Sequence, residues 1–508
     1  TQERFNVRQL IIVALCSWFV CPPMTGTAAP LRPVPNIVFI LIDDLRYDTF
    51  GHMDHPFIET PSIDQLASGG MRFTNAFVTT SLCSPSRASF LTGKYMHNHK
   101  VVDNTSLMDT ETQTFPQMLQ RADYRTAFIG KWHMGGSSDA ARPGFDHWVS
   151  FRGQGTYAPD RQTLNVNGTK GTRKKYMTDE LTDYATQWLT EQNRDQPFML
   201  YLSHKGVHGL YDPATRHRDR YREMQFRSPA TMINTAENVA AKPMWVQDQR
   251  NSWHGIEFPY HGRSKQSVPE MYNHYCEMIL SIDESVGRVI QTLRAKRIER
   301  ETLILFTSDG GHLWGEHGLI DKRCAYEESI RIPFLAYWPS RIKAGTLCDA
   351  LVANIDVAPT LLELAGVESR VKFDGKSFSA LLDDPKPDQS WRQAFVYEYY
   401  WEPSFPQTPT TFALRDHQYK LIQYHGLWDT DEFYNIEKDP AEAHNLIHVQ
   451  EHAKKISQMR QDLYQQLKET NGLAIPLGFK RNHGSNLRNA DGTKRAEFPE
   501  SMNNTSSN

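Results

Sequence analysis

Asn36-Ile37-Val38-Phe39-Ile40-Leu41-Ile42 is a continuous apolar run that leads directly into Asp43-Asp44. An apolar residue at every position, rather than at alternate positions, is typical of a strand that is covered on both faces. Strands of this kind belong to parallel sheets that lie between layers of helices. The run therefore predicts a buried strand of an α/β fold that carries two carboxylates at its carboxyl end.

Three further apolar runs have the same character, and polar residues follow each of them. Residues 126–129 lead into Gly130-Lys131-Trp132-His133, residues 198–202 into Ser203-His204-Lys205-Gly206-Val207-His208, and residues 302–307 into Ser308-Asp309. Helical patterns separate the runs, which predicts a large, mostly parallel sheet sandwiched by helices. Ligands of such sheets bind outside the carboxyl ends of the strands. A single polar residue there is more simply a loop residue or a helix cap, but four strands that deliver Asp, Lys, His and Asp to one edge predict a site.

The 508 residues divide into four expected segments. They are a signal peptide at residues 1–29, a large N-terminal α/β domain at 30–382, a smaller C-terminal α+β domain at 383–481, and a polar, disordered tail at 482–508. In the smaller domain, residues 393–400 and 411–424 are predicted strands, and residues 452–469 are a predicted amphipathic helix.

The N-terminus has the charged, apolar, small-residue order of a secretory signal peptide. Its apolar run is too short to span a bilayer comfortably, although a retained membrane anchor is the alternative. Export predicts a secreted or periplasmic protein that is free of the membrane after the signal is cleaved.

Composition excludes some classes of protein and leaves others open. The formal net charge of -3 argues against a nucleic-acid binder, but a locally basic pocket can still hold an anion. The spacing of the six cysteines suggests neither a disulfide framework nor a zinc site. A bridge between Cys324 and Cys348 is left open, since an oxidising compartment would permit it.

The polar residues at the strand ends suit a metal and an anion. Asp43, Asp44 and Asp309 offer hard oxygen ligands, which suit Ca²⁺ or Mg²⁺ better than zinc, although Asp43-Asp44 alone is equally explained as a helix cap. Several cations and histidines that can neutralise a tetrahedral oxyanion or transfer protons accompany them: Arg87, Lys94, Lys131, Lys322, His133 and His208. For any lone lysine, a solvated surface position is the simpler interpretation.

Three motifs together resemble those of the sulfatase family, over roughly residues 35–446. Cys83-Ser84-Pro85-Ser86-Arg87, followed by Leu91-Thr92-Gly93, is similar to the family's Cys-x-Pro-x-Arg motif with its Leu-Thr-Gly extension. Residues 130–135 are similar to its Gly-Lys-Trp-His-Leu-Gly, and residues 309–322 to its Asp-Asn-Gly…Gly-Glu-His-Gly…Lys segment. The resemblance implies an alkaline-phosphatase-like fold and hydrolysis of sulfate esters by a formylglycine that a maturation enzyme makes from Cys83.

The resemblance also implies a role for each matching residue. It assigns a divalent cation, usually calcium, to Asp43, Asp44, Asp309 and the modified Cys83, stabilisation of the formylglycine to Arg87, and the surroundings of the sulfate to Lys131, His133, His208 and Lys322. His204 is a weaker candidate than His208. Gly310 departs from the family, which usually has Asn there as a further ligand, because glycine has no side-chain oxygen. Water, a backbone carbonyl or His312 would then complete the shell, or the affinity for the metal is reduced.

The expected substrate is a sulfated saccharide. Residues 398–401 and 405–410 are similar to segments of N-acetylglucosamine-6-sulfatases and of mucin- and heparan-desulfating enzymes, and residues 212–261, which lack periodicity, are expected to form an insertion that sets specificity. Trp401 and Phe405 would either stack on a sugar or pack between the two domains. The alternatives are a phosphodiesterase or phosphonate monoester hydrolase of the same superfamily, and a non-catalytic protein that binds sulfated glycans.

Overall fold

The computed structural model describes residues 34–135, 137–159, 161–240, 242–257, 266–426 and 429–475. The predicted signal peptide and polar tail lie outside these residues. Within these ranges, none of the helices combines the length and the apolar composition that a membrane span requires. Cys83, Cys276, Cys324 and Cys348 are all buried and free, so the bridge left open between Cys324 and Cys348 is not formed.

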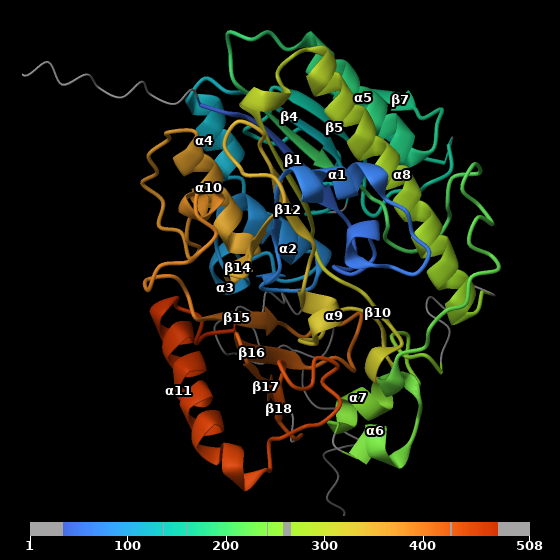
Figure 1. The fold of residues 1–508 in the computed structure, drawn as a ribbon, viewed down its shortest axis with the longest axis vertical. Helices are drawn as coiled ribbons and strands as arrows, with labels where there is room; N and C mark the ends of the chain where they lie inside the picture. The colour runs from blue at the N-terminus through green and yellow to red at the C-terminus, as the bar shows by residue number, and fades with distance from the viewer. Residues whose placement is uncertain are drawn as a thin grey trace, which may run out of the picture. The chain divides into compact units, whose positions relative to one another are not determined.

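In the described part of the chain, ten strands form one large sheet in the order β13-β2-β12-β9-β1-β8-β4-β5-β6-β7 (Figure 1). The strands from β9 to β5 are parallel to one another, and antiparallel strands extend the sheet at both edges. The four apolar runs of the sequence are the neighbours β9, β1, β8 and β4, which confirms the predicted α/β fold. The strands are β13 (Thr346–Cys348), β2 (Met71–Phe73), β12 (Phe334–Tyr337), β9 (Thr302–Ser308), β1 (Asn36–Ile42), β8 (Phe198–Ser203), β4 (Arg125–Gly130), β5 (His147–Ser150), β6 (Thr163–Val166) and β7 (Thr169–Thr172).

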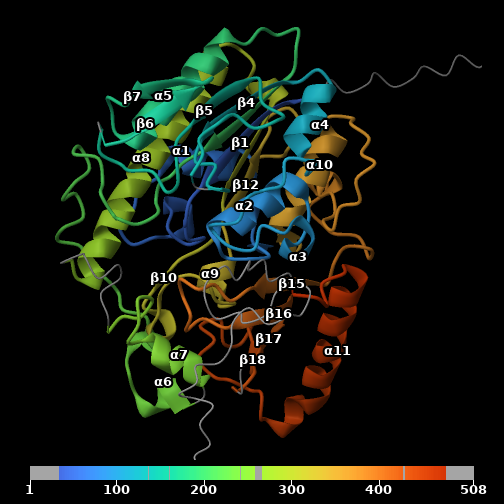
Figure 2. The same cartoon turned by 180° about the vertical axis from the view of Figure 1, so that it is seen from behind.

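Strand β1 shows why every one of its positions is apolar. Successive side chains of a strand point to opposite faces of the sheet. Phe39 and Leu41 belong to a core with α2 (Cys83–Thr92), α4 (Phe115–Arg121) and α10 (Val357–Leu364). Val38 and Ile40 belong to a second core with α1 (Pro61–Gly69), α5 (Met177–Glu191) and α8 (Val268–Ala295). Figures 1 and 2 show α4 and α10 on one side of the sheet and α5 and α8 on the other.

A second, antiparallel sheet follows in the C-terminal part of the chain. It consists of β15 (Ala394–Tyr399), β16 (Thr410–Asp416), β17 (Tyr419–His425) and β18 (Glu432–Asn435), and α11 (Ala453–Glu469) packs against it. The single strand predicted at residues 411–424 was wrong, because the chain turns between β16 and β17. The carboxylate of Asp416 accepts the backbone N–H groups of Gln418 and Tyr419 and so stabilises that turn. The domain boundary at residue 382 stays a prediction.

Several short helices and strands lie outside these two sheets. Residues 212–240 and 242–257, the described part of the expected insertion, contain one turn of 3-10 helix at Ala230–Met232, two short α-helices and irregular chain. The remaining elements are α3 (Met96–His99), α6 (Ala236–Ala240), α7 (Met244–Gln249), α9 (Glu327–Ile330), β3 (Ala76–Phe77), β10 (Leu313–Trp314), β11 (Ile320–Asp321) and β14 (Val352–Ala353).

Gly130 ends β4 in a conformation that no larger residue can adopt without strain. Its φ is +129°, and a Cβ atom at this position would lie 1.8 Å from the carbonyl oxygen of Ser203 in β8. The close approach lets the backbone N–H of Lys131 donate to that same oxygen at 2.8 Å. A glycine is therefore needed here to hold the chain that carries Lys131 against β8.

We expect Gly130→Ala to lower the free energy of unfolding by at least about 2 kcal/mol, because the Cβ clashes with backbone in a strained region. Gly171→Ala is the matched control, since Gly171 lies in exposed β7 and a Cβ added there would have no atom within 4 Å. The control should change stability by no more than about 0.5 kcal/mol. Urea unfolding followed by tryptophan fluorescence measures both, and equal losses would contradict the argument.

Candidate active site

The carboxyl ends of four adjacent parallel strands bring the predicted site residues together. β1 carries Asp43 and Asp44, and the segments after β4, β8 and β9 carry the others. Cys83 and Arg87 come from α2, and Lys322 follows β11. Every predicted site residue is at most 8% exposed: Asp43, Asp44, Cys83, Arg87, Lys131, His133, His208, Asp309 and Lys322.

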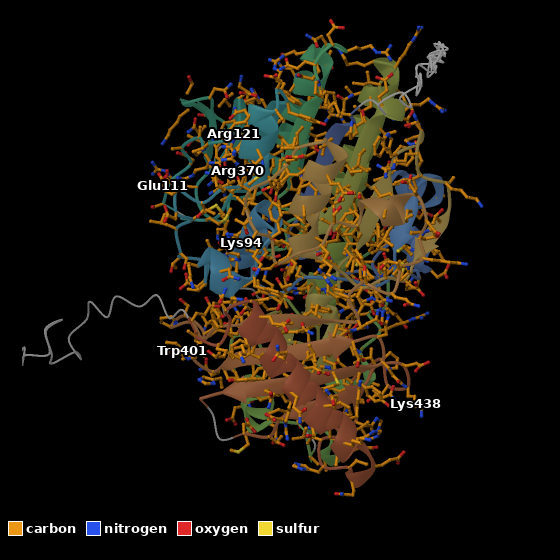
Figure 3. The ribbon with its side chains drawn as sticks, turned by 90° about the vertical axis from the view of Figure 1, so that its left-hand side faces the viewer. Lys94, Glu111, Arg121, Arg370, Trp401 and Lys438 are labelled. Carbon is orange, nitrogen blue, oxygen red and sulfur yellow. The ribbon has the colours of Figure 1, made fainter. Side chains whose placement is uncertain are left out.

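Helix α2 explains the spacing of the Cys-x-Pro-x-Arg motif. Cys83 is its first residue, and Pro85 lies in the first turn, where a backbone N–H has no partner within the helix. Arg87 is one turn further on the same side as Cys83, and its Nε donates to Asp309 Oδ2 at 2.8 Å. Lys94 lies beyond the far end of this ten-residue helix, about 15 Å along its axis from Cys83, so it is not part of the site (Figure 3).

The Cys83 thiol lies among charged groups. Its Sγ is 3.3 Å from Asp43 Oδ1 and 3.0 Å from Lys322 Nζ. Burial and the charge of Asp43 raise the pKa of this thiol to about 12. Because the thiolate is the nucleophilic form of cysteine, this shift works against reaction of the unmodified thiol.

Each buried carboxylate of the site has a cation beside it. Asp43 pairs with Lys131, Asp44 with Lys322, and Asp309 with Arg87. Burial alone would raise the pKa of Asp43, but Lys131 and the other nearby cations hold it well below its usual range. The pKa of Asp44 rises to about 7, because burial and the neighbouring carboxylates outweigh Lys322.

The donor set fits a hard divalent cation. Asp43, Asp44, Cys83 and His208 offer ligand atoms that all lie within 4.8 Å of one another, and Oδ2 of Asp44 is buried without a hydrogen-bond partner. Carboxylate oxygens are the ligands that Ca²⁺ and Mg²⁺ prefer. Asp309 lies beside this group, since its Oδ1 accepts the backbone N–H of Asp44 at 3.1 Å.

Gly310 leaves room where the family usually has an asparagine. A Cβ at this position would have no atom nearer than 3.9 Å, and its backbone is not in the left-handed region. The absence of a side chain is therefore a property of this sequence and not a steric requirement of the fold.

The histidines divide between the site and the core. Nδ1 of His133 lies 3.2 Å from Ser84 Oγ, and Nε2 of His208 lies 3.7 Å from Asp44 Oδ2. Burial and the charge of Lys131 hold the pKa of both imidazoles well below the usual range. His204, the weaker candidate, contacts Ser285 of α8 at 3.0 Å and so faces the core.

A cavity of about 450 Å³ opens onto the site, a volume within the range of small-ligand pockets. Sequence analysis missed Gln154, whose Oε1 accepts from Lys131 Nζ at 2.5 Å. Gln154 follows β5, so recognition of that short strand would have revealed it by the strand-end rule. The residues that line the cavity are Asn104, Gln154, His208, Trp253, His254, Asp321, Lys322, Arg323, Ser404 and Phe405.

Two of the segments expected to set specificity reach this cavity. Trp253 and His254 come from the insertion after β8, and Phe405 comes from the segment after β15. Phe405 packs between the His254 ring, at 4.4 Å between centroids, and the Arg323 guanidinium, at 3.9 Å. Trp401, labelled beside the C-terminal strands in Figure 3, lines a separate cavity with Trp245 and Asp429.

Known proteins are similar to this chain in both sequence and fold. A family model described as Sulfatase matches residues 35–367, and one described as N-sulphoglucosamine sulphohydrolase, C-terminal, matches residues 315–469. An N-acetylglucosamine-6-O-sulfatase of Bacteroides thetaiotaomicron is 32% identical, over 86% of this chain and 86% of its own. An N-acetylglucosamine-6-sulfatase of Homo sapiens is 30% identical, over 78% of this chain and 72% of its own.

A solved structure described as a complex with its substrate D-glucosamine-2-N,6-O-disulfate has a TM-score of 0.81 and 29% identity, and the match covers 88% of this chain and 100% of that one. The phosphonate monoester hydrolase of Agrobacterium radiobacter shares the fold at a TM-score of 0.68 and 20% identity, over 86% of this chain and 96% of its own. Since the sulfatase model spans most of the chain and carries the predicted motifs, this chain belongs to the sulfatase family.

Proposed function

We propose that this sulfuric ester hydrolase removes the 6-O-sulfate of an N-acetylglucosamine or related glucosamine residue in a sulfated saccharide. The observation that carries the proposal is the cavity that His208 and Lys322 line together with Trp253 and Phe405. Cationic and proton-bearing groups suit a sulfate, and the exposed ring of Trp253 suits a sugar ring. The relatives named as N-acetylglucosamine-6-sulfatases and the neighbour with a bound glucosamine disulfate support the choice of sugar.

We also propose that a maturation enzyme converts Cys83 to formylglycine. The hydrate of that aldehyde supplies one hydroxyl to attack sulfur and a second through which the sulfate is later released. The Cys-x-Pro-x-Arg motif supports this change, and an unmodified thiol lacks the second hydroxyl through which the sulfate is released.

The remaining site residues have roles that follow from their charge and position. Asp43, Asp44 and Asp309 would hold Ca²⁺, or alternatively Mg²⁺, with the modified Cys83 as a further ligand. Lys131 and Lys322, with the amino end of α2, would offset negative charge that develops on the sulfate. These groups account for binding of the anion without any contribution from the sugar.

Proton transfer falls to groups that border the same space. Lys322 and His208 both line the cavity. Lys322 is placed to donate a proton to the oxygen of the leaving sugar, and the neutral imidazole of His208 has its Nε2 toward the same space, where it can accept and return a proton. His133, whose lowered pKa keeps its imidazole neutral, is the base that we assign to the release of sulfate. Arg87 holds Asp309 in place through its Nε, and its Nη1 holds the segment after β4 through bonds to the carbonyl of Lys131 and to Ser203.

Export and domain organisation belong to the same proposal. Residues 1–29 would direct the chain out of the cytoplasm and be removed, and residues 30–382 and 383–481 would form the two domains. Sulfated saccharides outside the cell are then the accessible substrates.

Cys83→Ala should lower turnover of sulfate esters by more than about 1,000-fold, because it removes the nucleophile. The matched control is Cys348→Ala, which removes another buried free cysteine and should keep activity within about twofold of the parent. Both are assayed on 4-nitrophenyl sulfate after co-expression with a maturation enzyme. Mass spectrometry of the peptide that contains residue 83 reports the modification, and full activity of Cys83→Ala would sink the proposal.

Gly310→Asn should strengthen calcium binding by about tenfold, because it adds an oxygen ligand where the structure has room. Gly310→Ala fills the same space without an oxygen and should leave the affinity unchanged. Isothermal titration calorimetry of the EDTA-treated proteins with calcium measures both. Equal affinities in the two variants would show that the position does not face the metal.

Trp253→Ala should raise KM for N-acetylglucosamine 6-sulfate by about tenfold and change KM for 4-nitrophenyl sulfate by less than about twofold, because only the sugar needs the aromatic wall.

A panel of sulfated saccharides, phosphodiesters and phosphonate monoesters on the parent enzyme tests the substrate class. Faster turnover of a phosphodiester or phosphonate monoester than of any sulfate ester would favour the alternative hydrolase.

A further inference from the structure

Lys205 is a buried lysine next to the site that has no role in the functions proposed above. It is 2% exposed, and it does not line the cavity. Among the described residues no carboxylate oxygen lies within 4.0 Å of its Nζ, which instead stands 4.0 Å above the centre of the Tyr157 ring. Burial of an ammonium group without an ion pair is costly, so its position calls for a physical explanation.

The contacts of Lys205 converge on the segment that carries His208. Its Nζ lies 3.4 Å from the carbonyl oxygen of Gly209, and the Nδ1 of His208 lies 2.5 Å from the same oxygen. Burial and the charge of Lys131 lower the pKa of Lys205 to about 7, but both the ammonium and the amine keep an N–H to donate. The Gly209 carbonyl is thus bound from two sides.

The hydroxyl of Tyr157 binds the backbone of the same segment, on the residues before Gly209. It donates to the carbonyl oxygen of His208 at 2.6 Å and lies 3.3 Å from that of Lys205. The Tyr157 ring is itself held, because Arg173 donates to its backbone carbonyl at 2.9 Å and the ring stacks on Tyr176 at 5.5 Å. The aromatic ring therefore fixes both Lys205 and the backbone of His208.

These bonds decide how the imidazole of His208 is presented. With Nδ1 donating to the Gly209 carbonyl, Nε2 is the nitrogen that faces the site, 3.7 Å from Asp44 Oδ2. If the Gly209 carbonyl or the His208 backbone turned, the ring would turn with it. A hydrogen bond from one ring nitrogen of a histidine to a backbone carbonyl commonly fixes which nitrogen is left to face a ligand.

We propose that Lys205 and Tyr157 are positioning residues that orient the His208 imidazole toward the bound sulfate ester. The inference rests on the role proposed for His208, and it extends that role to two residues that do not touch the substrate. Neither side chain needs to change its charge or donate a proton during the reaction.

The test is a set of double-mutant cycles in the full, matured enzyme. Lys205→Met and Tyr157→Phe should each lower kcat for N-acetylglucosamine 6-sulfate by about tenfold or more, and His208→Ala by about 100-fold or more. In the His208→Ala background, Lys205→Met and Tyr157→Phe should cause no further loss, because residues that act through one group are not additive. Independent, multiplicative losses would overturn the proposal.

Lys242→Met is the matched control for loss of a buried lysine. Its Nζ stands 4.7 Å from the centres of the Tyr326 and Tyr434 rings and donates to the Tyr434 hydroxyl at 2.7 Å, away from the site. This variant should lower the melting temperature without changing kcat by more than about twofold. An equal loss of kcat in Lys242→Met would mean that Lys205 acts only through general stability, which would also overturn the proposal.

Failure of the proposed function has a different signature. If the parent enzyme hydrolyses no sulfate ester, the same cycles are measured as affinity for inorganic sulfate by calorimetry, and additivity there rejects the positioning role. If His208→Ala leaves both turnover and sulfate affinity unchanged, the role of His208 fails and the inference fails with it. If Lys205→Met does not fold, Tyr157→Phe carries the test alone.

Discussion

Three buried carboxylates and the cations beside them are the constraint on which the rest of the structure depends. Asp43, Asp44 and Asp309 lie at the ends of adjacent strands, where mutual repulsion and loss of water would make three ionised groups very unfavourable. Lys131, Lys322 and Arg87 offset that repulsion from three different segments. A buried ion pair adds little net stability, but removal of one partner is costly, so the cluster demands that every segment be in place.

Helix α2 joins this cluster to Cys83, the position of the proposed nucleophile. Its amino end carries Cys83, and one turn later Arg87 reaches Asp309, which follows β9, so a single helix ties the reactive position to the carboxylate set. The same Arg87 binds the carbonyl of Lys131 and the hydroxyl of Ser203, which fixes the ends of β4 and β8. The motif Cys-x-Pro-x-Arg thus has a structural role, because it fixes the distance between its first and last residues.

The surroundings of the site come from segments that lie outside the strands of the large sheet. The cavity combines residues of the insertion after β8, the segment after β11 and the segment after β15. A phosphonate monoester hydrolase shares the fold at 20% identity, so the fold by itself does not decide the substrate. We expect sulfatases that act on different substrates to differ in residues such as Trp253 and Phe405, which line the cavity.

The sequence by itself determined the four central strands of the large sheet and the polar residues that meet at their carboxyl ends. Apolar runs such as residues 36–42 are typical of buried strands, and a parallel sheet necessarily delivers their carboxyl ends to one edge. The sequence did not reveal the turn that separates β16 from β17, the exclusion of Lys94, or the orientation of His204 toward α8. Those depend on local hydrogen bonds and on which end of a helix faces the site. Only the tertiary structure decided that Gln154 bonds to Lys131 and that Lys205 packs on Tyr157, because contacts between segments far apart in the chain are set by packing and leave no periodic signal.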